Sequence, residues 1–184
     1  MIKHTKGLLL TLGALILAPS TASALPETEP HASAAALVGY GFHDVGGFGL
    51  GVRGGYTLRQ NIYLGGTFVY HFGTTQDFVG AEQHFNMYYF GFEGGYDFQV
   101  DPVIIRPYLG LGPAFGHYSL EPCVDTVGPF SIPCSDTNTN FGIWLGGTVL
   151  YPINEQWFIG GDFKLPIVDG EVIPTLAFTG GLNF

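Results

Sequence analysis

Charged residues are scarce in this sequence and make up only 11% of the chain. A typical soluble domain carries about a quarter, so the composition does not favour a protein surrounded by water on all sides. Long apolar segments are missing too, because no stretch reaches the about 20 residues that a transmembrane helix needs. Low charge without a membrane helix leaves two structures: an insoluble fibrous chain, or a barrel of strands that turns apolar side chains toward lipid.

Basic residues are the rarer of the charged kinds. The chain has 6 Lys and Arg against 15 Asp and Glu, for a formal net charge of -9. The bases are Lys3, Lys6, Arg53, Arg59, Arg106 and Lys164. Because binding to phosphate groups needs Lys and Arg, this balance argues against a nucleic-acid partner.

The first 24 residues have the features of a cleaved signal peptide. A basic start is followed by an apolar run from Gly7 to Ala18 and by Ala22-Ser23-Ala24. This order of basic, apolar and small-x-small segments is typical of a secretory signal. We expect residues 1–24 to be removed, residues 25–33 to form a short periplasmic leader and residues 34–184 to form one domain. Four bases against fifteen acids would then give the mature chain a formal charge of -11.

Alternation along the remaining chain predicts eight β-strands. In residues 48–58, bulky apolar side chains alternate with glycine, threonine and one arginine. Successive side chains of a strand point to opposite faces, so one face is bulky and apolar while the other is small or polar. The expected strands are Ala34–Phe42, Phe48–Leu58, Ile62–Phe72, Phe85–Phe98, Ile104–Tyr118, Asn140–Tyr151, Trp157–Leu165 and Ile173–Phe184.

The bulky face is expected to point outward. Eight strands enclose an interior only just wide enough for side chains to fill it, and a bulky residue at nearly every alternate position would not fit there. The glycine-rich face does fit. The sequence therefore predicts an all-β fold, an eight-stranded antiparallel up-and-down transmembrane β-barrel whose solvent is lipid.

Connections and glycines support this architecture. The links Arg59–Asn61, Val100–Val103 and Pro152–Gln156 are short, whereas Gly73–His84, Ser119–Thr139 and Pro166–Val172 are longer. Short periplasmic turns and longer outer loops are typical of outer-membrane barrels. Gly-Gly pairs recur at 54–55, 65–66, 94–95, 146–147, 160–161 and 180–181. They predict a ring of glycines near the lower waist, where large lumen side chains need room.

The last strand ends in alternating aromatic and small residues and closes on Phe184. With the signal peptide and the eight alternating strands, this ending resembles the small outer-membrane β-barrels of the OmpA/OmpX type. The resemblance covers nearly all of the mature chain. It implies the cell outer membrane as the location, a lipid bilayer with lipopolysaccharide as the surroundings, and Phe184 as a signal read by the barrel-assembly machinery. Members of this family differ in function, so the fold does not choose among their roles.

The alternation along the expected strands places six charged residues on the inward face: Arg53, Glu93, Asp97, Arg106, Asp162 and Lys164. If the hairpin turns at Asp101-Pro102, Asp97 lies opposite Arg106. Because buried charges must be paired, we expect these residues to form an ion-paired plug that closes the lumen. A narrow, gated channel for small solutes is the alternative for the same residues.

One short motif suggests an enzyme instead. His117-Tyr118-Ser119 resembles the His-x-Ser of outer-membrane lipid A deacylases, and Glu121 would be its orienting acid. In that family Asn-Ala-Gly follows, whereas Leu120-Glu121-Pro122 follows here. A lipid A-modifying hydrolase that uses His117 and Ser119 is the main alternative to a non-enzymatic protein.

The only two cysteines, Cys123 and Cys134, lie in the longest predicted loop. A chain that passes through the oxidising periplasm normally pairs its cysteines, so we expect one disulfide there. Two cysteines without nearby histidines make a poor zinc site, and the sequence predicts no metal and no cofactor. We expect a non-enzymatic outer-membrane barrel with a structural or surface-interaction role, whose extracellular ligand the sequence does not name.

Overall fold

The computed structural model describes residues 29–42, 46–73, 75–78, 81–121 and 135–184. No helix long and apolar enough to cross a membrane occurs in these ranges. The expected signal peptide and the predicted cysteine pair, Cys123 and Cys134, lie outside the described residues.

Eight long strands form the wall of the molecule. They are β1 (His31–Gly41), β2 (Gly47–Thr57), β3 (Ile62–His71), β5 (Ala81–Tyr96), β7 (Val103–Glu121), β8 (Ser135–Pro152), β9 (Trp157–Val168) and β11 (Thr175–Asn183). Three short strands are added to them: β4 (Thr75–Phe78), β6 (Phe98–Val100) and β10 (Glu171–Val172). β6 continues β5 toward the turn at Asp101, and β4 and β10 form hairpins with β5 and β9.

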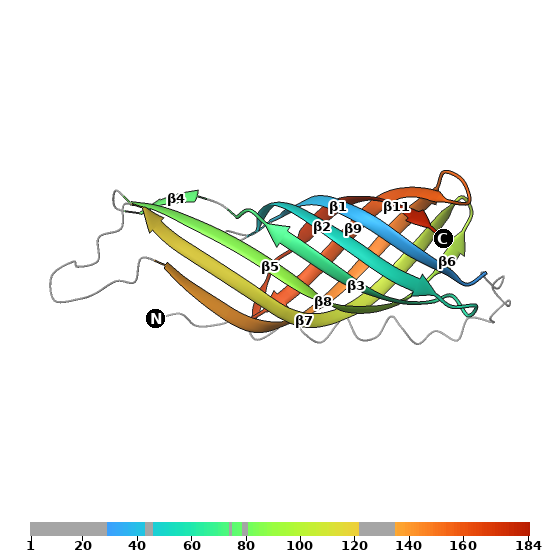
Figure 1. The fold of residues 1–184 in the computed structure, drawn as a ribbon, viewed down its shortest axis with the longest axis horizontal. Coiled ribbons are helices and arrows are strands. Elements are labelled where there is room, and N and C mark those ends of the chain that lie inside the picture. The colour runs from blue at the N-terminus through green and yellow to red at the C-terminus, as the bar shows by residue number, and fades with distance from the viewer. Residues whose placement is uncertain (1–28, 43–45, 74, 79–80, 122–134) are drawn as a thin grey trace, which may run out of the picture.

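The wall closes on itself (Figure 1). Each long strand pairs antiparallel with its neighbours in the chain, β1 pairs with β11, and β5 pairs with both β3 and β7. At the seam, the Phe184 amide donates a hydrogen bond to the Ala32 carbonyl at 2.9 Å. The predicted fold class is therefore confirmed: the protein is a closed eight-stranded antiparallel barrel.

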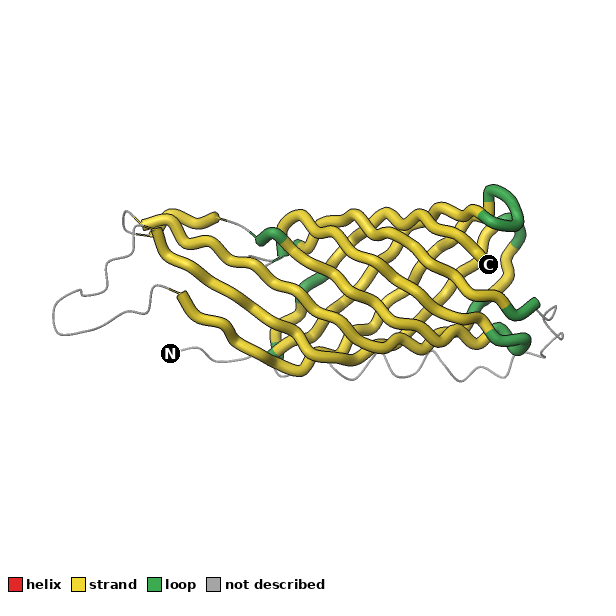
Figure 2. The backbone as a smooth tube through the Cα atoms, in the orientation of Figure 1, coloured by secondary structure: helices red, strands yellow, loops and turns green. Residues whose placement is uncertain are grey.

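Three neighbouring strands are longer than the sequence predicts. β3 ends at His71, which pairs with Met87, and β9 ends at Val168, which pairs with Gly142. Above these points, β5, β7 and β8 pair only with one another and with β4. We call this raised part the ledge: β4 with residues 81–86, 116–121 and 135–139. It projects beyond the barrel rim in Figure 2.

The ledge corrects two predicted loops, Gly73–His84 and Ser119–Thr139, because both contain strand residues. Apolar alternation stops where the wall leaves lipid, but the hydrogen-bonded ladder continues from Asn138 to Ser135 opposite β7. The limits also differ at β1, which begins at His31, three residues before the expected start of the barrel.

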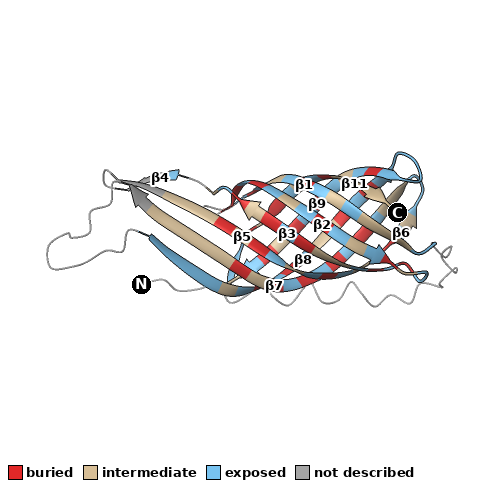
Figure 3. Ribbon diagram, in the orientation of Figure 1, coloured by how far each residue is buried: buried red, intermediate tan, exposed pale blue. Residues whose placement is uncertain are grey.

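The predicted orientation of the two faces is confirmed. Phe48, Leu50 and Val52 are exposed on the outside of β2, whereas Arg53 and Thr57 are buried inside. Figure 3 shows the same alternation of exposed and buried positions around the wall. Such an apolar outer surface is typical of a barrel wall that contacts lipid.

Aromatic side chains border this exterior at both ends. At the outer end, Tyr88 stacks on Phe115 with 4.8 Å between ring centroids, and Tyr70 stacks on Tyr88 at 6.4 Å. At the end with the short turns, Tyr96 meets Phe98 edge to face at 4.9 Å. Two such girdles are typical of the membrane interfaces of outer-membrane barrels.

Each Gly-Gly pair places one glycine inside and one outside. A Cβ atom on the inward Gly146 would lie 2.3 Å from Cζ of Tyr108, and one on Gly55 would lie 2.4 Å from Cε2 of Tyr63. A Cβ on the outward Gly161 would meet nothing within 4 Å. The inward glycines therefore make the room for lumen aromatics that the sequence predicted.

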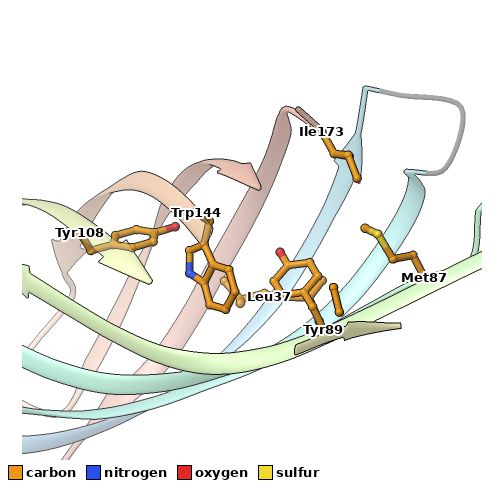
Figure 4. Close-up of a cluster of buried hydrophobic side chains, with 8 residues drawn as sticks. Leu37, Met87, Tyr89, Tyr108, Trp144 and Ile173 are labelled. Carbon is orange, nitrogen blue, oxygen red and sulfur yellow. The ribbon is translucent and has the colours of Figure 1, made fainter. Parts of the chain in front are cut away.

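The buried apolar core lies inside the lumen rather than between layers (Figure 4). Tyr89, Tyr108 and Trp144 form its middle, and Leu37, Met87 and Ile173 lie around them toward the outer opening. They come from β1, β5, β7 and β8, with Ile173 from the link between β10 and β11, and they fill the interior together with the charged residues.

Candidate functional site

The lumen charges form two separate clusters. The cluster nearer the periplasmic turns joins Arg106 to Asp97. The Arg106 guanidinium donates from Nε to Oδ1 at 2.6 Å and from Nη2 to Oδ2 at 2.8 Å. Thr57 donates its hydroxyl to Asp97 at 3.4 Å, and the guanidinium lies 3.8 Å from the centroid of the Tyr63 ring. The predicted pairing of Asp97 with Arg106 is confirmed.

The second cluster centres on Arg53, which joins two carboxylates. Its Nε lies 2.8 Å from Oε2 of Glu93, and its Nη1 donates to Oδ2 of Asp162 at 2.8 Å. Lys164 donates from Nζ to the other Glu93 oxygen, Oε1, at 2.9 Å. All four side chains are buried, and two positive and two negative groups leave the cluster with no formal net charge.

Neutral side chains complete the second cluster. Trp144 donates its indole N–H to Glu93 at 3.0 Å. Tyr108 donates to Asp162 at 3.0 Å, and Thr148 donates to Asp162 at 2.6 Å. These bonds matter because a buried ion pair is stable only when most of its remaining lone pairs and protons are satisfied. Here Nη2 of Arg53 is buried without a hydrogen-bond partner among the described residues.

The expectation of a single plug is corrected by this geometry. Among the described residues, no ion pair links Arg106 or Asp97 to the other four charges. Arg106 faces Asp97 across one hairpin close to the turn, whereas Arg53, Glu93 and Asp162 lie further up three different strands. Alternation along each strand shows which side chains point inward. The position of each side chain along the barrel axis determines which of them are in contact.

The residues that the sequence did not single out are Thr57, Tyr63, Tyr108, Trp144 and Thr148. Each interrupts the small face with a hydroxyl or an aromatic ring that carries a donor. Trp144, for example, lies on the same face of β8 as Gly142, Gly146 and Thr148. A large aromatic on a glycine face is the signal that points to a lumen role, since it must be accommodated by neighbouring glycines.

The outer half of the lumen is narrow. The rings of His71 and Tyr89 stack with 6.0 Å between centroids, and both are buried. With Lys164 they line a cavity of about 20 Å³. A second cavity of about 20 Å³ lies beside Arg106 near the periplasmic end. Spaces of this size admit about one water each, so these two cavities add little open volume beside the clusters.

A wider cavity of about 220 Å³ opens at the foot of the ledge. Apolar side chains including Met87 and Ile173 line its base, and Asn138 lines it from β8. Asp169 and Glu171, on the β9–β10 hairpin, lie at its exposed side. This outer opening is therefore acidic at its edge and apolar at its base.

The possible hydrolase motif lies on the outer face of the ledge. His117 pairs with Thr137 across β7 and β8, and its Nδ1 lies 3.0 Å from the Thr137 hydroxyl. Ser119 pairs with Ser135, and Glu121 is the last residue of β7. The His117 ring thus contacts a threonine on the next strand and not Ser119. Within the described ranges, no group of three or more His, Cys, Asp and Glu side chains is arranged to hold a metal ion.

Comparison with known proteins identifies the family. Residues 8–183 match the family described as "Outer membrane protein beta-barrel domain". The chain belongs to this family. Its location is the outer membrane, as the sequence predicted. No curated protein matches the chain.

Three solved structures show the same fold. Ail, the attachment invasion locus protein of Yersinia pestis, has a TM-score of 0.54 at 16% identity, over 86% of this chain and 99% of Ail. The N-terminal barrel of Pseudomonas aeruginosa OprF has a TM-score of 0.54 at 18% identity, over 84% and 97%. A major outer membrane protein of Thermus thermophilus has a TM-score of 0.62 at 13% identity, over 85% and 100%. At such low identity the likeness concerns the fold alone.

Proposed function

We propose that this protein is a non-enzymatic surface barrel that binds a positively charged partner through its ledge and the acidic β9–β10 hairpin beside it. The proposal rests on the ledge, because β5, β7 and β8 continue as a paired sheet beyond the rim of the barrel instead of ending there. A hydrogen-bonded sheet holds its side chains in fixed positions, which a recognition surface needs.

Charge indicates the class of partner. Arg53, Arg106 and Lys164 are buried in the lumen, and Arg59 lies in a periplasmic turn. The outer segments of the sequence contain acids but no Lys or Arg. Such a surface attracts cationic partners and repels polyanions.

The relatives provide a useful contrast. Ail has been crystallised in complex with the heparin analogue sucrose octasulfate. A sulfated ligand needs basic side chains, which the outer surface of this chain lacks. We therefore expect attachment through a partner of opposite charge and no binding of heparin.

The two alternatives find less support. A channel would have to pass both charge clusters, beside which the described cavities measure only about 20 Å³. A Ser-His hydrolase needs a hydrogen bond between nucleophile and base, whereas the described partner of His117 is Thr137. Planar-bilayer recordings of the full protein should show no steady conductance, and lipid A from cells with and without the protein should have the same mass.

The binding proposal is tested by neutralising acids at the two ends of the barrel. Asp136→Asn, Asp169→Asn and Glu171→Gln remove three exposed outer acids, and Asp101→Asn with Glu155→Gln, which removes two exposed acids at the other end, is the periplasmic control. We expect a fluorescent lysine-rich peptide to bind wild type and the control equally and the outer variant severalfold more weakly, with loss of binding at high salt. Equal binding by all three proteins, or binding of heparin by wild type, would contradict the proposal.

A further inference from the structure

The cavity of about 220 Å³ at the foot of the ledge has an apolar, buried base. Met87, Ala114 and Ile173 line it there, and their exposed fractions are only 4%, 2% and 2%. Figure 4 shows Met87 and Ile173 at the end of the lumen core, beyond Tyr89. The base of the cavity is therefore the outer surface of the packed lumen core.

Two aromatic side chains form the wall above this base. Phe85 of β5 pairs with Tyr118 of β7, and both line the cavity. Nearer the base, Gly116 pairs with Met87 on one side and with Asn138 on the other. A Cβ atom added to Gly116 would lie 3.2 Å from Cζ of Phe85. The glycine thus leaves space between the base and the two rings.

The exposed edge of the cavity is acidic. Asp169 and Glu171 line it from the β9–β10 hairpin, and both are exposed. On the ledge, the exposed Asp136 pairs with Tyr118 across β7 and β8. No basic side chain is among the described residues that line the cavity.

This order, with the apolar base below the acidic edge, determines which part of a ligand enters. A lysine or arginine side chain inserted alone would carry its charge to the apolar base, where an unpaired charge is costly to bury. An apolar side chain avoids that cost and displaces water that has few polar partners there. Positive charges beside it in the ligand would then remain at the edge, close to the carboxylates.

The size and the walls of the cavity indicate a single aromatic side chain. Sites for drug-sized ligands measure about 300–1,000 Å³, and this cavity, at about 220 Å³, is smaller. Phe85 and Tyr118 can stack on an aromatic ring or meet its edge, and aromatic pairs prefer both arrangements. Aromatic residues in desolvated pockets are also frequent anchors of protein interfaces. An acidic edge repels an amphiphile with a negative head, such as a fatty acid.

We propose that the cavity binds one aromatic side chain of the cationic partner, in a segment where lysine or arginine flanks that residue. The ring enters between Phe85 and Tyr118 and packs on Met87 and Ile173. The flanking bases meet the acids at the edge. This inference rests on the proposed function, and it specifies a mixed aromatic and basic motif in place of positive charge alone.

The test fills the cavity with side chains of the barrel itself. Asn138→Trp adds an indole ring inside the cavity, and Gly116→Val fills the space below Phe85. Thr139→Trp is the matched control, because the next residue of the same strand points to the outside. Heat-modifiable migration on gels establishes that each variant is folded.

Fluorescence anisotropy then compares two labelled peptides that contain the same number of lysines. One has a central phenylalanine, and the other has serine in its place. The barrels are held in phosphatidylcholine nanodiscs, which add neither free detergent nor net charge, and empty nanodiscs give the background. We expect wild type and Thr139→Trp to bind the phenylalanine peptide severalfold more tightly than the serine peptide. Asn138→Trp and Gly116→Val should bind both peptides equally.

Equal, salt-dependent binding of the two peptides by wild type would overturn this inference and leave the proposed function standing. An advantage of the phenylalanine peptide that persists in both filled variants would also overturn it, because the ring would then bind elsewhere. Absence of salt-dependent binding by either peptide would overturn the inference and the proposed function together.

Discussion

Arg106 and Asp97 face each other across the β5–β7 hairpin, and the guanidinium holds both carboxylate oxygens, at 2.6 and 2.8 Å. Two parallel bonds between planar groups fix direction as well as distance. Among the described residues, this pair makes no ion pair with the cluster above it.

Arg106→Ala should lower the free energy of unfolding by about 3–5 kcal/mol, because it leaves the Asp97 carboxylate buried without its partner. Arg59→Ala, in an exposed turn, is the control and should change little. Urea-dependent unfolding from lipid vesicles measures both. The double variant Asp97→Ala/Arg106→Ala should be more stable than the sum of its single variants predicts. Equal effects of the Arg106 and Arg59 variants would indicate that the lumen around Asp97 is open to water.

The glycine pair 146–147 offers a test of inward against outward positions. Gly146→Ala should destabilise the barrel by about 1–3 kcal/mol, since the new methyl group overlaps the Tyr108 ring. Gly147→Ala should have little effect, because the nearest atom to an added Cβ is at 4.0 Å. The same urea-dependent assay measures the free energy of unfolding of both variants. A loss of stability in Gly147→Ala as large as in Gly146→Ala would contradict the assignment of the two faces.

Phe184→Asp should reduce the amount of folded protein in the outer membrane. The Phe184 side chain is 74% exposed, so it contributes few contacts within the barrel. A role in recognition by the assembly machinery therefore predicts lower assembly in cells but normal refolding of purified protein into detergent. Normal levels of folded Phe184→Asp protein in the outer membrane would show that Phe184 is not such a signal.

Cys123 and Cys134 should form one disulfide in protein isolated from the periplasm or outer membrane. Closing this short loop should stabilise the protein by about 3 kcal/mol at most, through the unfolded state. The barrel should survive Cys123→Ser/Cys134→Ser, because its paired strands lie elsewhere. Thiol titration of denatured, unreduced protein measures the bond, and two free thiols would exclude it.

The fold could be predicted from the sequence because lipid imposes a strict alternation. Phe48, Leu50 and Val52 face lipid and Arg53 faces the lumen. The alternation alone therefore predicts which face of each strand points outward. The contact between Asp97 and Arg106 could be predicted as well, since a tight turn at Asp101-Pro102 determines the register of its two strands.

Contacts between distant strands could not be predicted in the same way. Arg53 meets Asp162 across the lumen, and no local pattern specifies the relative height of strands so far apart in the chain. The ledge was missed for a different reason. Residues 135–139 are polar on both faces, because above the membrane neither side needs apolar residues, while backbone hydrogen bonding continues without any signal in side-chain type.

The seam between β1 and β11 determines how the barrel must form. These two strands are the furthest apart in the sequence of any paired strands, so their contact closes the longest loop and is intrinsically slow to form. Until it forms, both strands expose unpaired edges that can join other chains. Successful folding therefore depends on keeping nascent copies apart until each has closed its own ring.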